Sequence, residues 1–148
     1  MKTLAFNRRA SFDYHIQDTW EAGIELYGNE VKSLKYGRGS LKGAFVTVYG
    51  DDLYLINTHI PHYQNHQDTT FDPERIRKLL MHQREIDSLI GKKSQEGLTI
   101  VPIRLYLKRG KVKVEIGLAK GKKKHDKRQD IKEKDEKREM QRTIKKRV

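Results

Sequence analysis

The stretch GLAKGKKKHDKR, residues 117–128, marks the point where a folded pattern gives way to a basic tail. Up to Leu118, apolar and polar residues alternate as they do in half-buried strands. From Ala119 to Val148 the chain has 14 Lys or Arg against 6 Asp or Glu, which is +8 of its total charge of +12. The sequence therefore predicts one folded domain, residues 1–118, followed by a basic tail, residues 119–148.

The overall composition points to a polyanionic partner. The 148 residues are 35% charged, and the pI is about 9.8, which favours binding to nucleic acid or an acidic surface. The absence of cysteine excludes disulfides, a thiolate nucleophile and a zinc finger. No apolar run is long enough for a signal peptide or a membrane span. We therefore expect a cytoplasmic protein with no membrane partner.

Alternating segments upstream of the tail come in pairs joined by turns. Residues 98–108 and 112–118 flank Arg109-Gly110, and residues 44–49 and 53–56 flank Gly50-Asp51-Asp52. A third alternating pair covers residues 12–16 and 20–26. Short hairpin connections favour closure over a doubly wound sheet. The predicted fold is mainly β with helices: a small antiparallel OB-like closed barrel with two or three flanking helices.

Two segments have helical spacing. Asn29 can cap a short helix that Gly37 ends. The triplet Asp72-Pro73-Glu74 is typical of a helix start, and the apolar residues that follow predict a helix over residues 74–90. On this stripe Leu80 is expected to be mainly a core residue.

The tail has too few large apolar residues to form a core of its own. It is therefore predicted to be disordered when free and to leave a folded domain if it is removed. After Asp130 it has neither glycine nor proline, so it can become helical against a partner.

No motif for catalysis stands out. His59, His62 and His66 lie close enough in sequence for a metal site, but a polar loop is the more common meaning of such spacing. His125-Asp126 resembles an oriented base but falls in the tail, where groups are not positioned. We predict a non-enzyme with no metal or cofactor. The rival is a metal-dependent nuclease that uses the three histidines.

Lysines and arginines neutralise phosphates, while tyrosines and phenylalanines stack on unpaired bases. The sequence therefore predicts an RNA-binding protein.

Segments in order along nearly the whole chain resemble small protein B, the SsrA-binding protein family of bacteria. They are NRRASFDY, EAGIEL, GNEVKSLKYG, DPERIRKLLMHQREI, GLAKGKKKHDKR and DIKEK. The resemblance implies an OB-type barrel that binds the tRNA-like domain of transfer-messenger RNA. It also implies delivery of that RNA to a stalled ribosome for trans-translation, with the tail forming a helix in the empty messenger channel near the decoding centre. A monomer is expected, and the alternative is a ribosomal or ribosome-assembly protein.

The resemblance also implies site residues. The RNA-binding set is Asn7, Tyr14, Glu21, Lys78, Leu80, Lys113, Gly121, Lys122 and Lys123. The ribosome-binding set is His125, Asp126, Lys127, Arg128, Met140 and Ile144. A carboxylate such as that of Glu21 repels phosphate but can accept hydrogen bonds from base amino groups or ribose hydroxyls. The chain departs from the family at Thr143-Ile144, where many members have two larger apolar residues.

Overall fold

The computed structural model describes residues 1–63, 71–121, 132 and 135–143. The elements are β1 (Lys2–Phe6), α1 (Ala10–Asp13), β2 (Tyr14–Ile24), α2 (Gly28–Lys35), β3 (Phe45–Tyr49), β4 (Asp52–Ile56), β5 (Arg77–Leu80), α3 (Gln83–Glu96), β6 (Thr99–Lys108) and β7 (Lys111–Gly121). Residues 135–143, here called the C-terminal helical segment, are helical too. The prediction of a mainly β fold is confirmed, and the described residues contain four helical elements where two or three are expected. No helix in these ranges is long and apolar enough to cross a membrane.

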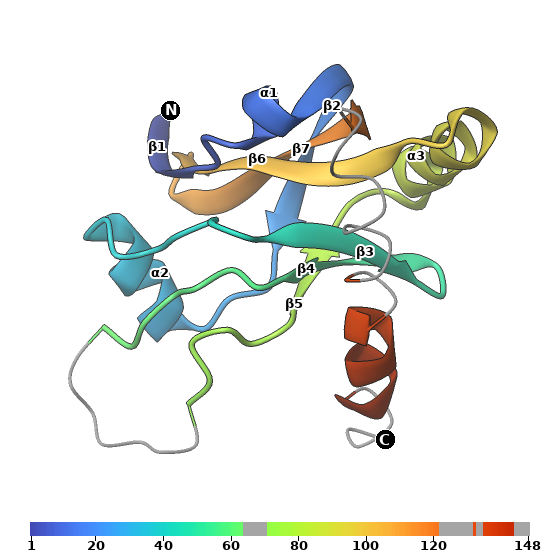
Figure 1. Cartoon of the computed structure of the whole chain (residues 1–148). Helices are drawn as coiled ribbons and strands as arrows, with labels where there is room; N and C mark the ends of the chain where they lie inside the picture. Colours follow the sequence, from blue (N-terminus) through green and yellow to red (C-terminus); the bar gives the residue numbers. More distant parts are fainter. Residues whose placement is uncertain (64–70, 122–131, 133–134, 144–148) are drawn as a thin grey trace.

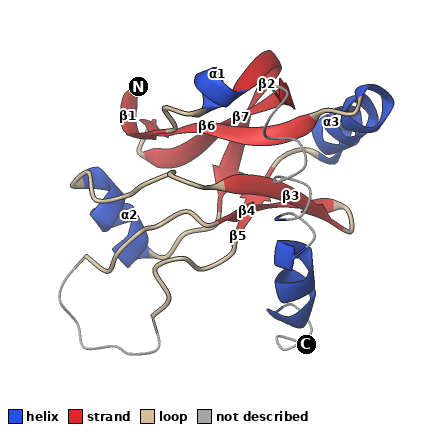
Figure 2. Ribbon diagram, viewed as in Figure 1, coloured by secondary structure: helices blue, strands red, loops and turns tan. Residues whose placement is uncertain are grey.

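The seven strands form one antiparallel sheet that folds over on itself, and β2 joins its two halves (Figure 1, Figure 2). The strand order is β1-β6-β7-β2-β5-β4-β3. β2 pairs with β7 along most of its length, and with β5 only at Gly23 and Ile24. Apolar side chains from both halves fill the space between the layers, among them Leu53, Leu55, Leu79, Leu105, Ile116 and Leu118.

The prediction of a closed barrel is wrong. The two edges of the sheet are β1 and β3, and no strand pairing joins them in the described part of the chain. β6 has β7 on one side and β1 on the other. β3 lies against β6 but finds no free backbone edge there. The two halves therefore meet through side chains and not through a closing ladder of hydrogen bonds.

The N-terminal region contains one long strand where the sequence predicts two. Residues 10–13 form α1, and β2 then runs from Tyr14 to Ile24. A bulge between Ile16 and Asp18 keeps β2 paired with β7. Because a bulge adds one residue to one strand, it shifts the alternation of side chains. The sequence of this single strand therefore contains two separate alternating segments, which is the pattern expected of two strands.

The helix predicted over residues 74–90 is wrong in its first half, because residues 77–80 form β5 and α3 begins only at Gln83. Asp72 does cap a turn, and its Oδ1 accepts a hydrogen bond of 2.9 Å from the Glu74 N–H, but no helix follows. Arg77 and Leu79 are buried, whereas Leu80 is 47% exposed. Leu80 is therefore not the core residue that the helical stripe predicts.

The last strand extends three residues beyond Leu118, where the sequence predicts its end. β7 continues to Gly121, and Ala119 is fully buried between Ile16 of β2 and Thr99 of β6. Part of the predicted tail therefore belongs to the sheet. The functional division at 118/119 stays a prediction.

The C-terminal helical segment packs against the β3–β4 hairpin. Met140 is fully buried in a cluster with Phe45 and Ile56. The few apolar residues of the tail predict no such intramolecular packing, yet one methionine on one face of the segment is sufficient for it. Disorder of the free tail stays a prediction.

Candidate nucleic-acid interface

One side of β2, β5, β6 and β7 turns away from the core, and we call it the outer face. Gly23 of β2 pairs with Leu80 on one side and with Lys113 on the other, and Lys113 pairs with Tyr106. Side chains paired across strands, or two residues apart along a strand, lie on the same face. The outer face therefore brings together four of the predicted RNA-binding residues: Glu21, Lys78, Leu80 and Lys113.

Glu21 is held on this face by two neighbours from β6. The Tyr106 hydroxyl donates a hydrogen bond to Glu21 Oε2, and Lys108 Nζ lies 3.2 Å from the same oxygen. The hydrogen bond from Tyr106, followed by the charges of Lys108 and Lys113, lowers the pKa of Glu21. At neutral pH this residue is therefore an ionised acceptor in a fixed orientation. Tyr106 and Lys108 are absent from the predicted site, because only the register of β6 against β7 and β2 reveals them.

A hollow of about 450 Å³ lies beside Glu21. Its lining consists of Glu21, Gly23, Leu80, Met81, His82, Glu85 and Lys113. A Cβ on Gly23 would come within 3.2 Å of Leu80 Cβ, so the glycine allows β5 to approach β2 closely at this point. The hollow thus combines two carboxylates, Glu21 and Glu85, with the Lys113 ammonium group and an exposed apolar wall.

The other end of the outer face holds Asn7, Tyr14 and Gly121. Tyr14 pairs with Gly121 and is buried in a small cluster with Val101 and Ala119. The Asn7 side chain donates a hydrogen bond of 2.8 Å to the Pro102 carbonyl. In this structure Asn7 therefore fastens the segment after β1 to β6, and Tyr14 holds the start of β2 against β6 and β7. Gly121 is where the chain leaves the sheet.

Most predicted residues of the tail lie outside the described residues. These are Lys122, Lys123, His125, Asp126, Lys127, Arg128 and Ile144. Met140 alone of the ribosome-binding set is described, and it contacts β3 and β4.

A buried ion cluster fixes α2 against β5 of the sheet. Glu30 and Arg77 are both fully buried. Arg77 Nη2 lies 2.6 Å from Glu30 Oε2, and Arg75 Nη2 lies 2.6 Å from Glu30 Oε1. The Tyr27 N–H donates to the same carboxylate over 2.9 Å, and Arg77 Nη1 donates to the Thr58 carbonyl over 2.6 Å. Sequence spacing gives no sign of this cluster, because its central pair, Glu30 and Arg77, is 47 residues apart.

Desolvation alone would raise the pKa of Glu30. The hydrogen bonds from Arg75 and Tyr27, together with the charge of Arg77, outweigh it and lower that pKa. The cluster therefore holds an ionised carboxylate in the interior.

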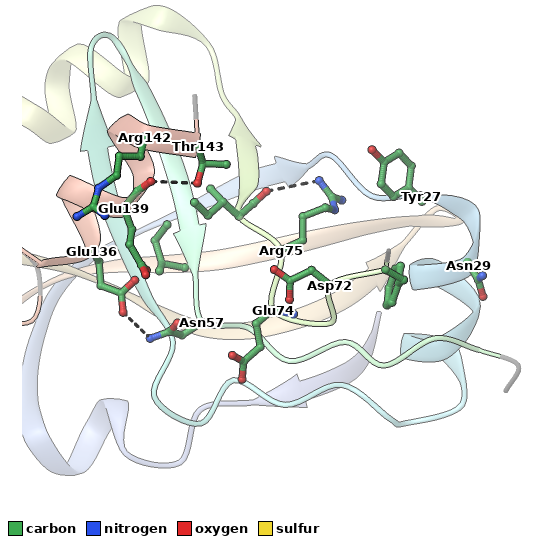
Figure 3. A pocket seen from close by; sticks show the side chains of 13 residues that line it. Tyr27, Asn29, Asn57, Asp72, Glu74, Arg75, Glu136, Glu139, Arg142 and Thr143 are labelled. Carbon is green, nitrogen blue, oxygen red and sulfur yellow. Dashed lines mark hydrogen bonds between the residues drawn. The ribbon is translucent and has the colours of Figure 1, made fainter. Parts of the chain in front are cut away.

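A groove of about 890 Å³ separates the C-terminal helical segment from residues 71–76 (Figure 3). Asn57 Nδ2 donates to Glu136 Oε1 over 3.3 Å across one end of it. Four carboxylates line the groove, Asp72, Glu74, Glu136 and Glu139, together with two arginines, Arg75 and Arg142. Because the carboxylates are in excess and Arg75 is already paired with Glu30, the groove is a poorer match for RNA phosphates than the outer face.

The histidine loop is only partly described, because His66 lies outside the described ranges. His59 Nδ1 lies 3.8 Å from Glu74, and His62 contacts the Asn29 amide and the edge of Phe71. Within the described residues, no group of three or more His, Cys, Asp or Glu is arranged to hold a metal. Both described histidines have structural neighbours.

Comparison with known proteins identifies the family. A family model described as SmpB protein matches residues 4–146. The chain belongs to the SmpB protein family. The SsrA-binding protein of Corynebacterium glutamicum is 51% identical over 145 residues, covering 98% of this chain and 88% of the relative. The SsrA-binding protein of Thermosynechococcus vestitus is 49% identical over 148 residues, covering 99% of this chain and 97% of the relative.

A solved structure described as "tmRNA-SmpB: a journey to the center of the bacterial ribosome" contains a similar chain. The two chains are 47% identical and superpose with a TM-score of 0.67, which covers 82% of this chain and 86% of the other. The similarity therefore extends to the fold that carries the outer face.

Proposed function

We propose that this protein binds the tRNA-like domain of transfer-messenger RNA and brings it to stalled ribosomes for trans-translation. Membership of the SmpB family over nearly the whole chain carries the proposal, together with relatives named for binding SsrA. The outer face supports it, because residues from four strands converge there in an arrangement suited to RNA. No catalytic step is part of this function, and the protein acts as a monomer without a cofactor.

The chemistry of the outer face explains how such binding would work. Glu21 is ionised and held by Tyr106, so it can accept hydrogen bonds from base amino groups or ribose hydroxyls. Lys113 and Lys78 supply charge for phosphates, and exposed Leu80 offers apolar contact to a base or ribose. The Glu21 carboxylate also repels any phosphate placed beside it. This repulsion favours the alignment of the RNA in which a base or a ribose lies next to Glu21.

The tail would carry the second half of the function. Gly121 ends β7 beside Tyr14, and Lys122 and Lys123, which follow it in the sequence, would contact the same RNA. His125, Asp126, Lys127 and Arg128 would meet ribosomal RNA, and Met140 and Ile144 would anchor a helix in the messenger channel. In this proposal residues 1–118 recognise the transfer-messenger RNA, and residues 119–148 sense the empty decoding site.

Sequencing of the RNA recovered with the protein from cells tests the proposal. Transfer-messenger RNA should be strongly enriched with the unmodified protein and less enriched with Glu21→Gln. Glu115→Gln is the matched control, because Glu115 is the cross-strand neighbour of Glu21 but forms its ion pair with Arg104. Ribosomal RNA alone, with the protein present on all ribosomes in stoichiometric amount, would instead indicate a ribosomal or assembly protein.

A further inference from the structure

A second cationic surface lies on α2 and the turn that follows it. Between Gly28 and Gly43 the exposed charged side chains are all basic: Lys32, Lys35, Arg38 and Lys42. The one acidic residue in this range, Glu30, is fully buried and neutralised by its two arginines. The electrostatic potential over α2 is therefore positive, because no exposed carboxylate of residues 28–43 offsets these charges.

Aromatic rings stand among these cations. Tyr36 is 67% exposed, and its ring centre lies 5.1 Å from that of Tyr63 at a tilt of 34°. Lys32 Nζ lies 5.9 Å from the centre of the Tyr63 ring, and Arg38 Nη1 donates to the Tyr63 carbonyl over 3.2 Å. We call these four residues the α2 surface. The exposed Tyr36 ring therefore lies against a second ring, that of Tyr63, which has two cations beside it. Aromatic rings with neighbouring cations bind unpaired nucleotides, because bases stack on the rings and phosphates meet the cations.

The α2 surface is built in advance of binding. The Tyr63 N–H donates to Asn29 Oδ1 over 3.0 Å, which ties the loop to the first turn of α2. Gly37 has a φ of +74°, and a Cβ on Gly39 would overlap the Leu34 side chain. Glycine therefore suits both positions that flank Arg38, and a larger residue at either one would disturb the turn that presents this arginine.

The α2 surface and the outer face lie on different sides of α2. Val31 lines a hollow together with Leu80 and Lys113 of the outer face. Successive helical residues are about 100° apart, so Lys32 and Tyr36 point about 100° and 140° around α2 from Val31. RNA on the outer face would therefore leave Lys32 and Tyr36 uncovered.

We propose that the α2 surface binds an unpaired nucleotide of ribosomal RNA while the outer face holds transfer-messenger RNA. The inference rests on the proposed function, since delivery requires one small domain to contact two RNAs at once. Two surfaces on different sides of α2 allow this without competition. Tyr36 supplies the stacking face, and Lys32 and Arg38 contact the flanking phosphates.

The test compares Tyr36→Ala with Tyr36→Phe in two binding assays. One measures the affinity of the protein for the tRNA-like domain of transfer-messenger RNA. The other measures binding of the preformed protein–RNA complex to ribosomes that carry a truncated messenger. Tyr36→Ala should weaken ribosome binding by about 5- to 150-fold, which is the range for loss of one stacked base. Tyr36→Phe should bind like the unmodified protein, and Lys32→Ala should lower the salt slope of ribosome binding by about one.

Tyr27→Ala is the matched control for an exposed tyrosine. Tyr27 is 60% exposed. The Arg75 guanidinium lies 4.4 Å from the centre of its ring, but this guanidinium is already paired with Glu30. This variant should bind ribosomes normally, and thermal unfolding checks that every variant is folded. The inference is refuted if Tyr36→Ala binds ribosomes normally, or if it weakens transfer-messenger RNA binding instead. Failure of the unmodified protein to bind transfer-messenger RNA would overturn the proposed function separately.

Discussion

Glu30→Gln removes one charge from the buried ion cluster and leaves Arg77 without its counter-ion. Arg77 is fully buried, and both Arg75 and Arg77 lie 2.6 Å from the Glu30 carboxylate. Breaking a buried pair by removing one partner costs about 3–5 kcal/mol, because the remaining charge stays desolvated. Folded domains are stable by only about 5–15 kcal/mol. We therefore expect the variant to lose a large part of its stability and to unfold about 6–20 °C lower.

Urea unfolding followed by circular dichroism measures the loss, with Glu115→Gln as control. The Arg104–Glu115 pair is 3.1 Å long, and its side chains are 23% and 29% exposed. Removing this surface pair should cost no more than about 1 kcal/mol. The double variant Glu30→Gln with Arg77→Met should lose less than the two single variants added together, since no buried charge remains. A loss below about 1 kcal/mol for Glu30→Gln would refute the reasoning.

The same cluster predicts a dependence of stability on pH. The pKa of Glu30 is lowered from its usual value of 4.5 in the folded protein. A lowered pKa means that the carboxylate contributes stability above the unfolded pKa and loses it as the pH falls through the folded one. The unmodified protein should therefore lose more stability than Glu30→Gln when the pH drops from neutral to below about 4.

Three further predictions follow from the outer face, the last strand and the tail. Glu21→Gln should weaken binding to transfer-messenger RNA with little change in salt slope, although a purely electrostatic surface would bind more tightly. A chain ending at Gly121 should keep the melting temperature of the domain better than one ending at Leu118, because Ala119 is buried and Tyr14 would lose its partner strand. Glu139→Pro should break the C-terminal helical segment and reduce tagging on stalled ribosomes, whereas Glu139→Ala should tag normally; normal tagging by the proline variant would exclude a functional helix.

The sequence predicts those strands in which alternation is uninterrupted. β3, β4, β6 and β7 lie within a few residues of their expected positions, since each has one face in the core and tight turns join them in pairs. Gly37 ends α2 as predicted, with the positive φ that glycine tolerates. The bulge in β2 and the edge position of β1 depend on partners far along the chain, which a local pattern does not contain.

β5 shows why local patterns fail. In the sequence, the apolar residues between Ile76 and Leu80 have the spacing of a helix. In the structure Arg77 points into the core, a place where a local pattern predicts an apolar side chain. Its burial becomes possible only because Glu30, on a different element, supplies the counter-charge. Long-range pairing therefore overrides local propensity at this position.

The candidate site could also be predicted only in part, because some of its residues are brought together by strand pairing. Resemblance to a family implies Glu21, Leu80 and Lys113, and the register of four strands brings them to one hollow. Tyr106 and Lys108, which orient Glu21, follow only from the pairing of β6 with β7. The assignment of function to every one of these residues stays a prediction.

The exit of the chain from the end of β7 has a consequence for avidity. Residues 122–134 link the sheet to the C-terminal helical segment, and 14 residue steps from Gly121 to Asp135 span at most about 50 Å. Any site on the ribosome within that radius meets the tail at an effective concentration in the millimolar range once the domain is bound. Individually weak contacts along the tail can then add up to tight attachment, and a linker lengthened by Gly-Ser residues would dilute this advantage without changing a single contact.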